Sequence, residues 1–217
     1  MSNFYTMDIQ LFTVGPFQEN TYLLVEQGEA MLIDPGFYSE SEYGGFKNQL
    51  ADSGANLQAV CLTHAHVDHI LGLNMVLNDF DVPVFVNRSD TYLWDNFPQQ
   101  AAMFGFSAQP VQAVPEPLPA QAAKKIGLFS FDVLYTPGHS PDHVSLYFKS
   151  SSFVIAGDVL FKESIGRTDL YKGSMEILSE SVRNELYTLP DSTKVYPGHG
   201  PSTTIAHEKE NNPFVKG

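Results

Sequence analysis

Cysteine is almost absent from this 217-residue chain: Cys61 is the only one, so no internal disulfide can form. Disulfide frameworks accompany secreted proteins, and nothing in this sequence points to an oxidising compartment. Cys61 stands within the apolar stretch Val60-Cys61-Leu62, which favours a small buried side chain over a catalytic nucleophile.

Long apolar runs are lacking as well. None approaches the roughly 20 residues that a bilayer-spanning helix needs. No basic segment followed by an apolar stretch opens the chain, as it would in a signal peptide. We therefore expect a cytoplasmic protein that does not bind membranes.

Basic residues are scarce, since 12 Lys and Arg face 25 Asp and Glu, for a formal net charge of −13. A protein that binds nucleic acid through its phosphates needs clustered cations, so we expect no nucleic-acid partner. The hydrophobic share of 43% and the charged share of 17% are typical of a globular protein. The length fits a single domain over residues 1–217.

Apolar runs and turn residues predict alternating strands and helices. The run 57–63 indicates a buried strand that leads into a helix at 69–79, and Gly44-Gly45 weakens the helix expected over about 40–50. Further strands are expected at 8–14, 21–25, 30–33, 82–86, 126–136, 144–149, 152–156 and 193–196, and further helices at 88–106, at 174–188 and after Pro201.

Three histidines and an aspartate lie within residues 64–69, in the motif T-H-A-H-V-D-H at the end of that buried strand. Imidazole and carboxylate groups are the usual protein ligands of zinc and similar metals. In extended backbone, His64 and His66 project to the same side and can reach one metal. Asp68 and His69, where the chain turns into the helix, can face a second metal.

Three more candidate ligands each follow an apolar strand and a glycine that permits a sharp turn: His139 in T-P-G-H-S-P, Asp158 in I-A-G-D and His199 in Y-P-G-H-G. Together with the first cluster they suffice for two metals with a shared carboxylate and open positions for water. His143, four residues after His139, either orients a ligand or serves packing.

The motif H-x-H-x-D-H, followed by P-G-H, G-D and P-G-H, resembles the metallo-β-lactamase superfamily, and within it the short bacterial proteins similar to glyoxalase II (hydroxyacylglutathione hydrolase). The resemblance extends over nearly the whole chain, including Asp34-Pro35-Gly36, the G-R-T-D stretch at 166–169 and the N-P-F stretch at 212–214. It implies an α/β fold, a four-layer αββα sandwich, and two metal sites: His64, His66 and His139 in one, Asp68, His69 and His199 in the other, with Asp158 bridging them.

The resemblance also implies a reaction. A hydroxide held between two divalent ions, with zinc expected and iron or manganese as alternatives, attacks the carbonyl of a small thioester such as S-lactoylglutathione. A thiolate leaves without prior protonation, because thiol pKa values lie near ~8.5, and Asp68 is the candidate acceptor of the water's proton. Arg167 falls where glyoxalase II enzymes carry a cation that contacts glutathione, and Lys162 is a second candidate. An ion pair with Asp169 is the alternative for Arg167.

The chain departs from full-length glyoxalase II after His199. Residues 200–217 leave no room for the helical domain that grips glutathione in those enzymes, and Gly200 and Pro201 stand where they carry a tyrosine. These departures weaken the expectation that the substrate contains glutathione. The aromatic stretch 94–106 is an alternative source of a pocket wall.

Two other functions fit the same ligand motif. A persulfide dioxygenase of this fold uses one iron held by two histidines and one aspartate, here His64, His139 and Asp158. The G-H-G sequence around the last histidine favours the hydrolase. A non-catalytic metal-binding protein would keep the full ligand set without turnover. A β-lactamase is disfavoured because those enzymes are usually exported.

Overall fold

A computed structural model describes residues 7–217 and divides the chain into two compact units. Unit 1 takes the chain up to Val86 with Tyr92–Pro117 and Lys125–Ser130, and unit 2 takes Asn87–Thr91, Leu118–Lys124 and Phe131–Gly217. Residues 1–6, part of the stretch inspected for a signal peptide, lie outside the described range. Among residues 7–217, no helix combines the length and apolarity that a membrane span requires.

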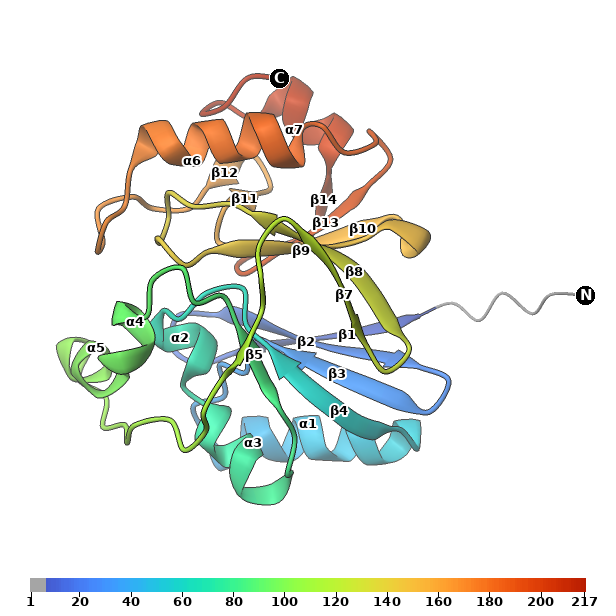
Figure 1. Cartoon of the computed structure of the whole chain (residues 1–217), viewed down its shortest axis with the longest axis vertical. Helices are drawn as coiled ribbons and strands as arrows, with labels where there is room; N and C mark the ends of the chain where they lie inside the picture. Colours follow the sequence, from blue (N-terminus) through green and yellow to red (C-terminus); the bar gives the residue numbers. More distant parts are fainter. Residues whose placement is uncertain (1–6) are drawn as a thin grey trace, which may run out of the picture. The chain divides into compact units, whose positions relative to one another are not determined.

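Unit 1 is built on a six-stranded sheet whose spatial order follows the chain (Figure 1). The first three strands pair in antiparallel fashion. The third strand also begins a parallel set with the three strands that follow it. At the tight turn between the second and third strands, Gln27 and Gly28 both have positive φ (48° and 86°), the conformation that a two-residue hairpin turn requires. The strands are β1 (Asp8–Val14), β2 (Glu19–Glu26), β3 (Glu29–Ile33), β4 (Asn56–Cys61), β5 (Val84–Val86) and β6 (Glu116–Pro117).

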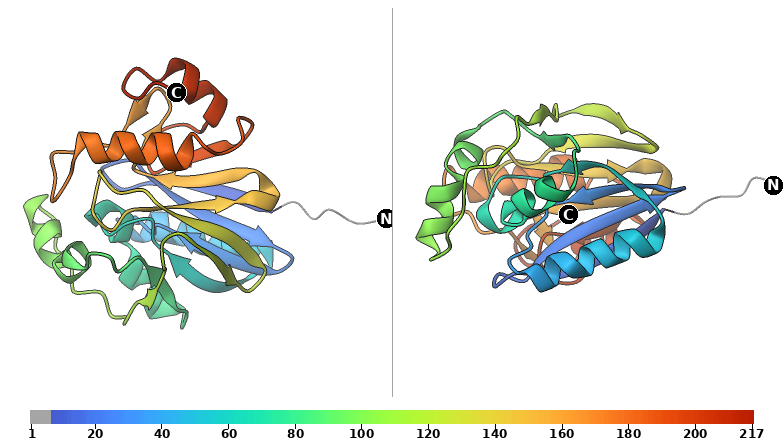
Figure 2. Two further views of the ribbon diagram at one scale, coloured as in Figure 1. Left: turned by 45° about the horizontal axis from the view of Figure 1, so that its top comes forward. Right: turned by 90° about the horizontal axis from the view of Figure 1, so that it is seen from below.

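Helix α1 (Glu40–Ser53) runs along this sheet (Figure 2) and is better defined than its two internal glycines suggest. Ser39 and Glu42 form a capping box at its start, and Gly54 ends it in the left-handed conformation. The Phe46 ring stacks on Phe37 with centroids 5.4 Å apart. Capping and burial of this aromatic face therefore outweigh the low helix propensity of the glycines.

The helix expected at 69–79 is interrupted, giving α2 (Val67–Ile70) and α3 (Leu73–Asp79). The break lies at Gly72, whose N–H donates to the Pro35 carbonyl at 2.9 Å. A Cβ at Gly72 would lie 2.7 Å from the Cβ of Phe37, so only glycine fits this close approach.

The helical stretch expected at 88–106 is likewise two helices, α4 (Tyr92–Asp95) and α5 (Phe97–Met103). Pro98 stands in the first turn of α5. Because proline has no N–H, it cannot continue the hydrogen bonds of a preceding helix, but it suits a helix start.

Unit 2 contains a second six-stranded sheet, in the order β14-β13-β10-β9-β8-β7. The strand expected at 126–136 is wrong in part, because the chain turns at Gly127 (φ 54°) and makes a hairpin. The strands are β7 (Ala122–Ile126), β8 (Phe129–Tyr135), β9 (Val144–Phe148), β10 (Phe153–Gly157), β13 (Lys194–Pro197) and β14 (Thr203–Thr204), with a separate small hairpin of β11 (Leu160–Phe161) and β12 (Ser164–Ile165).

One face of the unit 2 sheet is covered by helices near the C-terminal end of the chain (Figure 1). The helix predicted at 174–188 forms as α6 (Met175–Ser181), capped by Ser174, and continues as the π-helical turn η2 (Val182–Leu186). The remaining helices are α7 (Ile205–Asn211) and the 3-10 turn η1 (Lys149–Ser151). Leu178 and Leu186 share a buried cluster with Val154 of β10, so α6 and η2 lie on the sheet.

Candidate metal centre

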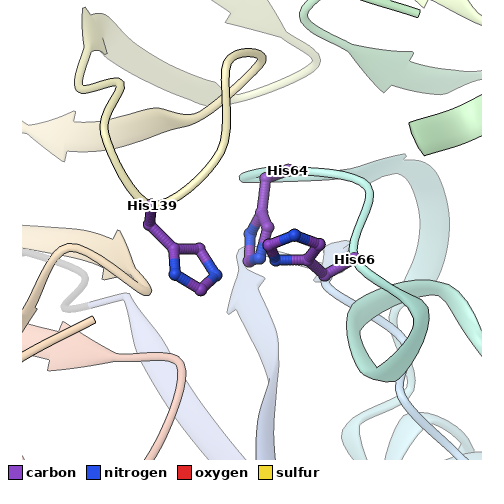
Figure 3. A group of neighbouring side chains, drawn as sticks. All are labelled: His64, His66 and His139. Carbon is purple, nitrogen blue, oxygen red and sulfur yellow. The ribbon is translucent and has the colours of Figure 1, made fainter. Parts of the chain in front are cut away.

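The loop after β4 carries the predicted ligands of unit 1. His66 keeps extended backbone (φ −68°, ψ 152°) immediately before α2, so the chain turns only after it. The His64 ring centroid lies 4.8 Å from that of His66 and 4.1 Å from that of His69, and all three rings are buried. Figure 3 shows the imidazoles of His64 and His66 on this loop; it also draws His139, which belongs to unit 2. The loop thus brings three imidazole rings close together.

Asp34 organises this loop from the neighbouring strand. It follows β3, which runs parallel to β4, so both strands end at the same edge of the sheet. Its carboxylate accepts from the Thr63 N–H at 2.7 Å, from the Thr63 hydroxyl at 2.6 Å and from His69 Nδ1 at 3.0 Å. The proton of His69 therefore lies on Nδ1, and its Nε2 carries the lone pair that a metal needs.

The same carboxylate determines the tautomer of His64 through Thr63. The Thr63 hydroxyl has one proton and gives it to Asp34, so its 3.0 Å contact with His64 Nδ1 requires the imidazole to donate. Asp34, His64 and His69 present ligand atoms within 4.8 Å of one another. Since three donors already point at the Asp34 carboxylate, we assign this residue to positioning the histidines.

Glu19 is a second buried carboxyl group, connected to Asp34 through the Thr21 hydroxyl. The Thr21 hydroxyl lies 2.7 Å from the Asp34 carbonyl and 2.8 Å from Glu19 Oε2. A carbonyl cannot donate, so Thr21 gives its proton to Asp34 and the proton in the other contact belongs to Glu19. Burial accordingly raises the pKa of Glu19 well above its ordinary value.

In unit 2, three strands deliver their following residues to one edge of the sheet. β10 runs parallel to β13, and β8 is antiparallel to β9, which is antiparallel to β10. His139, Asp158 and His199 follow β8, β10 and β13, so they converge. Asp158 Oδ2 lies 3.5 Å from His139 Nε2 and 3.4 Å from His199 Nε2.

Glycines make this convergence possible. The sequence predicts a sharp turn at a glycine before each of the three ligands, and at two of these glycines the backbone has positive φ. Gly138 (φ 123°) and Gly157 (φ 53°) precede His139 and Asp158 in conformations that side chains rarely adopt. A Cβ at Gly138 would collide with the backbone of Leu178, which lies in α6.

Hydrogen bonds also orient the unit 2 ligands. His139 Nδ1 donates to the Arg167 carbonyl at 2.8 Å, which leaves Nε2 toward Asp158. The Asp158 N–H donates to His143 Nε2 at 3.0 Å, so His143 carries its proton on Nδ1 and donates it to the Thr136 hydroxyl at 2.9 Å. Of the two roles considered for His143, the structure supports orienting a ligand.

The predicted substrate residues are exposed. Arg167 makes a two-pronged ion pair with Asp169, with N···O distances of 2.7 and 2.8 Å. The hydrogen bonds from Arg167 lower the pKa of Asp169 to about 2. Lys162 stands in the turn between β11 and β12. The ion pair with Asp169 is therefore present, and the substrate contacts of both residues stay predictions.

Several supporting residues escaped the sequence interpretation. Asp34 was noted only as part of a turn, and Thr63 and Glu19 were not singled out. For Asp34 a signal was available, because this acidic residue directly follows a buried apolar strand, much like Asp158. No sequence signal marks the Arg167 carbonyl, because any residue could supply it.

Residues 14–199 match the sequence pattern of the Metallo-beta-lactamase superfamily, and the chain belongs to this superfamily. The donor set suits the metals associated with such sites, since imidazole nitrogens and carboxylates bind zinc, iron and manganese. The predicted fold class and resemblance are confirmed.

Similar proteins agree with this membership. The hydroxyacylglutathione hydrolase GloC of Haemophilus influenzae is 34% identical over 214 residues, which cover 96% of this chain and 98% of that protein. The BLEG-1 B3 metallo-beta-lactamase structure is 36% identical with a TM-score of 0.85, covering 97% of this chain and 100% of that one. TTHA1623 in a di-iron-bound form is 35% identical with a TM-score of 0.85, covering 95% and 100%.

Proposed function

We propose that this protein is a cytoplasmic dinuclear metallohydrolase that cleaves small thioesters such as S-lactoylglutathione. The similarity to GloC supports the substrate class. We assign the ligands as the family resemblance implies, with zinc as the expected metal and iron as the main alternative: His64, His66 and His139 for one ion, Asp68, His69 and His199 for the other, and Asp158 for both.

The observation that carries the dinuclear proposal is the position of Asp158. Its Oδ2 lies within 3.5 Å of the Nε2 atoms of both His139 and His199. The resemblance assigns these histidines to different ions, so the short distances support a role for this carboxylate at both. A mononuclear dioxygenase needs only His64, His139 and Asp158, and it would leave His199 without a role in metal binding.

The protein's own groups would then prepare and guide the reaction. When bound, two divalent ions would lower the pKa of water and polarise the substrate carbonyl. Asp34 fixes the tautomers in which His64 and His69 would offer Nε2 to a metal, and Asp68 would accept the proton released from water. A thiolate leaving group needs no protonation before it departs, so these residues suffice without a separate general acid.

Metal content per chain, measured together with S-lactoylglutathione hydrolysis, tests the proposal. We expect two metals and turnover. His66→Ala should lose metal and lower kcat/KM by more than about 100-fold, because removing a ligand exceeds the effect of removing its outer partners. His207→Ala is the matched control, since His207 is a half-buried histidine paired with Glu163 at 2.9 Å.

Other results would redirect the proposal. One iron per chain with oxygen uptake on glutathione persulfide would identify a dioxygenase. Hydrolysis of the β-lactam nitrocefin without thioesterase activity would favour the activity named for BLEG-1. Two metals without turnover on any of these substrates would contradict the thioesterase, and full metal and activity in His66→Ala would contradict the ligand assignment.

A further inference from the structure

An exposed cluster of aromatic rings stands out on unit 1. The aromatic cluster consists of Phe17, Tyr38, Phe104 and Phe106. Phe17 meets Phe104 and Phe106 edge to face at 5.2 and 5.7 Å between centroids, and Tyr38 meets Phe106 at 5.3 Å. Phe17, Tyr38 and Phe104 remain 36%, 55% and 42% exposed. Contiguous exposed apolar groups of this kind mark binding surfaces.

The segments that carry the first two rings are held together by one carboxylate. Glu42 accepts from the Gly15 N–H at 2.9 Å through Oε1 and from the Tyr38 N–H at 2.8 Å through Oε2. Gly15 opens the β1–β2 turn that contains Phe17. The two rings are therefore presented by anchored backbone, which lowers the entropy cost of binding a ligand against them.

The aromatic cluster is also attached to the loop that carries the candidate metal ligands. Gly36, two residues before Tyr38, packs so closely that a Cβ would collide with the Asp68 carbonyl. The Gln100 amide of α5 also donates to the Ala65 carbonyl at 3.1 Å. Ala65 lies between His64 and His66, and α5 ends at Met103, just before Phe104. Two segments next to rings of the aromatic cluster, at Gly36 and at Gln100, therefore contact this loop.

The charge of unit 1 indicates what kind of group would bind there. Lys47 and Lys125 are its lysines, and its sequence contains no arginine. Lys47 is paired with Asp79 at 2.9 Å. Away from the candidate metal ligands, an anionic substrate group would find few cationic side chains on this unit, whereas an uncharged apolar group would bury ring surface.

We propose that the aromatic cluster binds the apolar acyl chain of the substrate, so that the preferred thioesters carry uncharged aliphatic or aryl acyl groups. This inference rests on the proposed function for the reaction, but the binding surface can be tested separately. It makes Phe17 and Tyr38 specificity-determining residues.

The test uses one neutral thiol, N-acetylcysteamine, in two matched series. Thioesters from acetyl to hexanoyl report kcat/KM, and the corresponding non-hydrolysable thioethers report Kd by calorimetry on zinc-loaded protein. We expect wild-type Kd to fall about two- to fourfold for each added CH2 group. Phe17→Ala and Tyr38→Ala should flatten this dependence, with a larger loss of kcat/KM for the hexanoyl thioester than for the acetyl thioester.

Phe214→Ala is the matched control, because Phe214 is an exposed ring of unit 2 with 53% of its surface accessible. It should keep the wild-type dependence on chain length. Thermal melts verify folding, and Tyr38→Ala, at the most exposed ring of the aromatic cluster, serves if Phe17→Ala is unstable. The inference would be overturned if the wild-type Kd did not change with acyl chain length. It would also be overturned if the variants kept the wild-type dependence of Kd on chain length. Chain-length-dependent binding without any thioester turnover would support the aromatic site and contradict the proposed hydrolase.

Discussion

The two units supply their candidate metal ligands in different ways. Unit 1 presents four of them on one short loop, and a single carboxylate, Asp34, orients two of the histidines. Unit 2 presents three ligands from three strand ends and orients two of them, His139 and Asp158, with separate partners, the Arg167 carbonyl and His143. Removing the hydrogen-bond partner in unit 1 should therefore misorient two ligands together, whereas removing one partner in unit 2 should misorient only one ligand.

Asp34→Asn should have the largest effect among the supporting residues. An amide retains the size of the side chain and tolerates the positive φ of 51°, but it loses the charge and directs N–H groups at one of its present donors. Because two ligands lose their orientation, we expect metal affinity to fall about 100-fold, the upper range for such partners. Competition with a chelator measures it.

Asp79→Asn is the control for Asp34→Asn, since Asp79 is a half-exposed carboxylate of the same unit paired with Lys47. It should leave metal affinity unchanged. An Asp34→Asn protein with wild-type affinity would show that the carboxylate does not orient the histidines.

His143→Ala should have a smaller effect, about tenfold on metal affinity, because it removes the acceptor of the Asp158 N–H and touches one ligand. His143→Gln should recover part of the loss, since its amide oxygen can accept the same hydrogen bond. Equal losses in His143→Ala and Asp34→Asn would remove the contrast between the two units.

Glu19→Gln sharpens the comparison through pH dependence. The pKa of Glu19 is raised in the folded protein, so folding is favoured below the unfolded pKa, and this contribution is lost as pH rises toward the folded pKa. In that window the wild type loses up to about 1.4 kcal/mol per pH unit from this group. Glutamine can still donate to Thr21 and does not titrate, so the metal-free variant should gain relative stability as pH rises from 4.

Urea unfolding of the metal-free proteins across pH 4–9 measures this difference. Glu185→Gln is a positive control in η2 of unit 2, because burial raises the pKa of Glu185 too, and this variant should likewise gain relative stability as pH rises. Parallel stability curves for wild type and Glu19→Gln would show that Glu19 is already ionised in the folded protein.

The contrast between the units also explains what the sequence could reveal. The H-x-H-x-D-H loop is compact in the chain, so its chemistry is visible without the fold. His139, Asp158 and His199 are 19 and 41 residues apart, and their convergence depends on strand order, for which local patterns carry no signal. They were found because each follows an apolar strand and a glycine.

Helix boundaries were predicted less well, for physical reasons. The break at Gly72 arises from contact with Phe37, which is distant in sequence, and the strength of α1 comes from its capping box and buried rings. Such tertiary effects override local propensity. Hydrogen-bond partners such as Asp34 and His143 likewise became assignable only when their neighbours were known.

Arg167→Ala should have the smallest effect on the fold and separates two roles for this side chain. Its ion pair with Asp169 is exposed, and exposed pairs contribute little to stability, so the thermal midpoint should change little. The pKa of Asp169 should rise from about 2 toward its ordinary value, as NMR titration would detect. The lowered pKa favours folding above the unfolded pKa, and this contribution disappears only as pH falls toward 2. If Arg167 also contacts an anionic thioester, KM should rise more than kcat falls, whereas an unchanged KM would restrict it to pairing with Asp169 and to the carbonyl that orients His139.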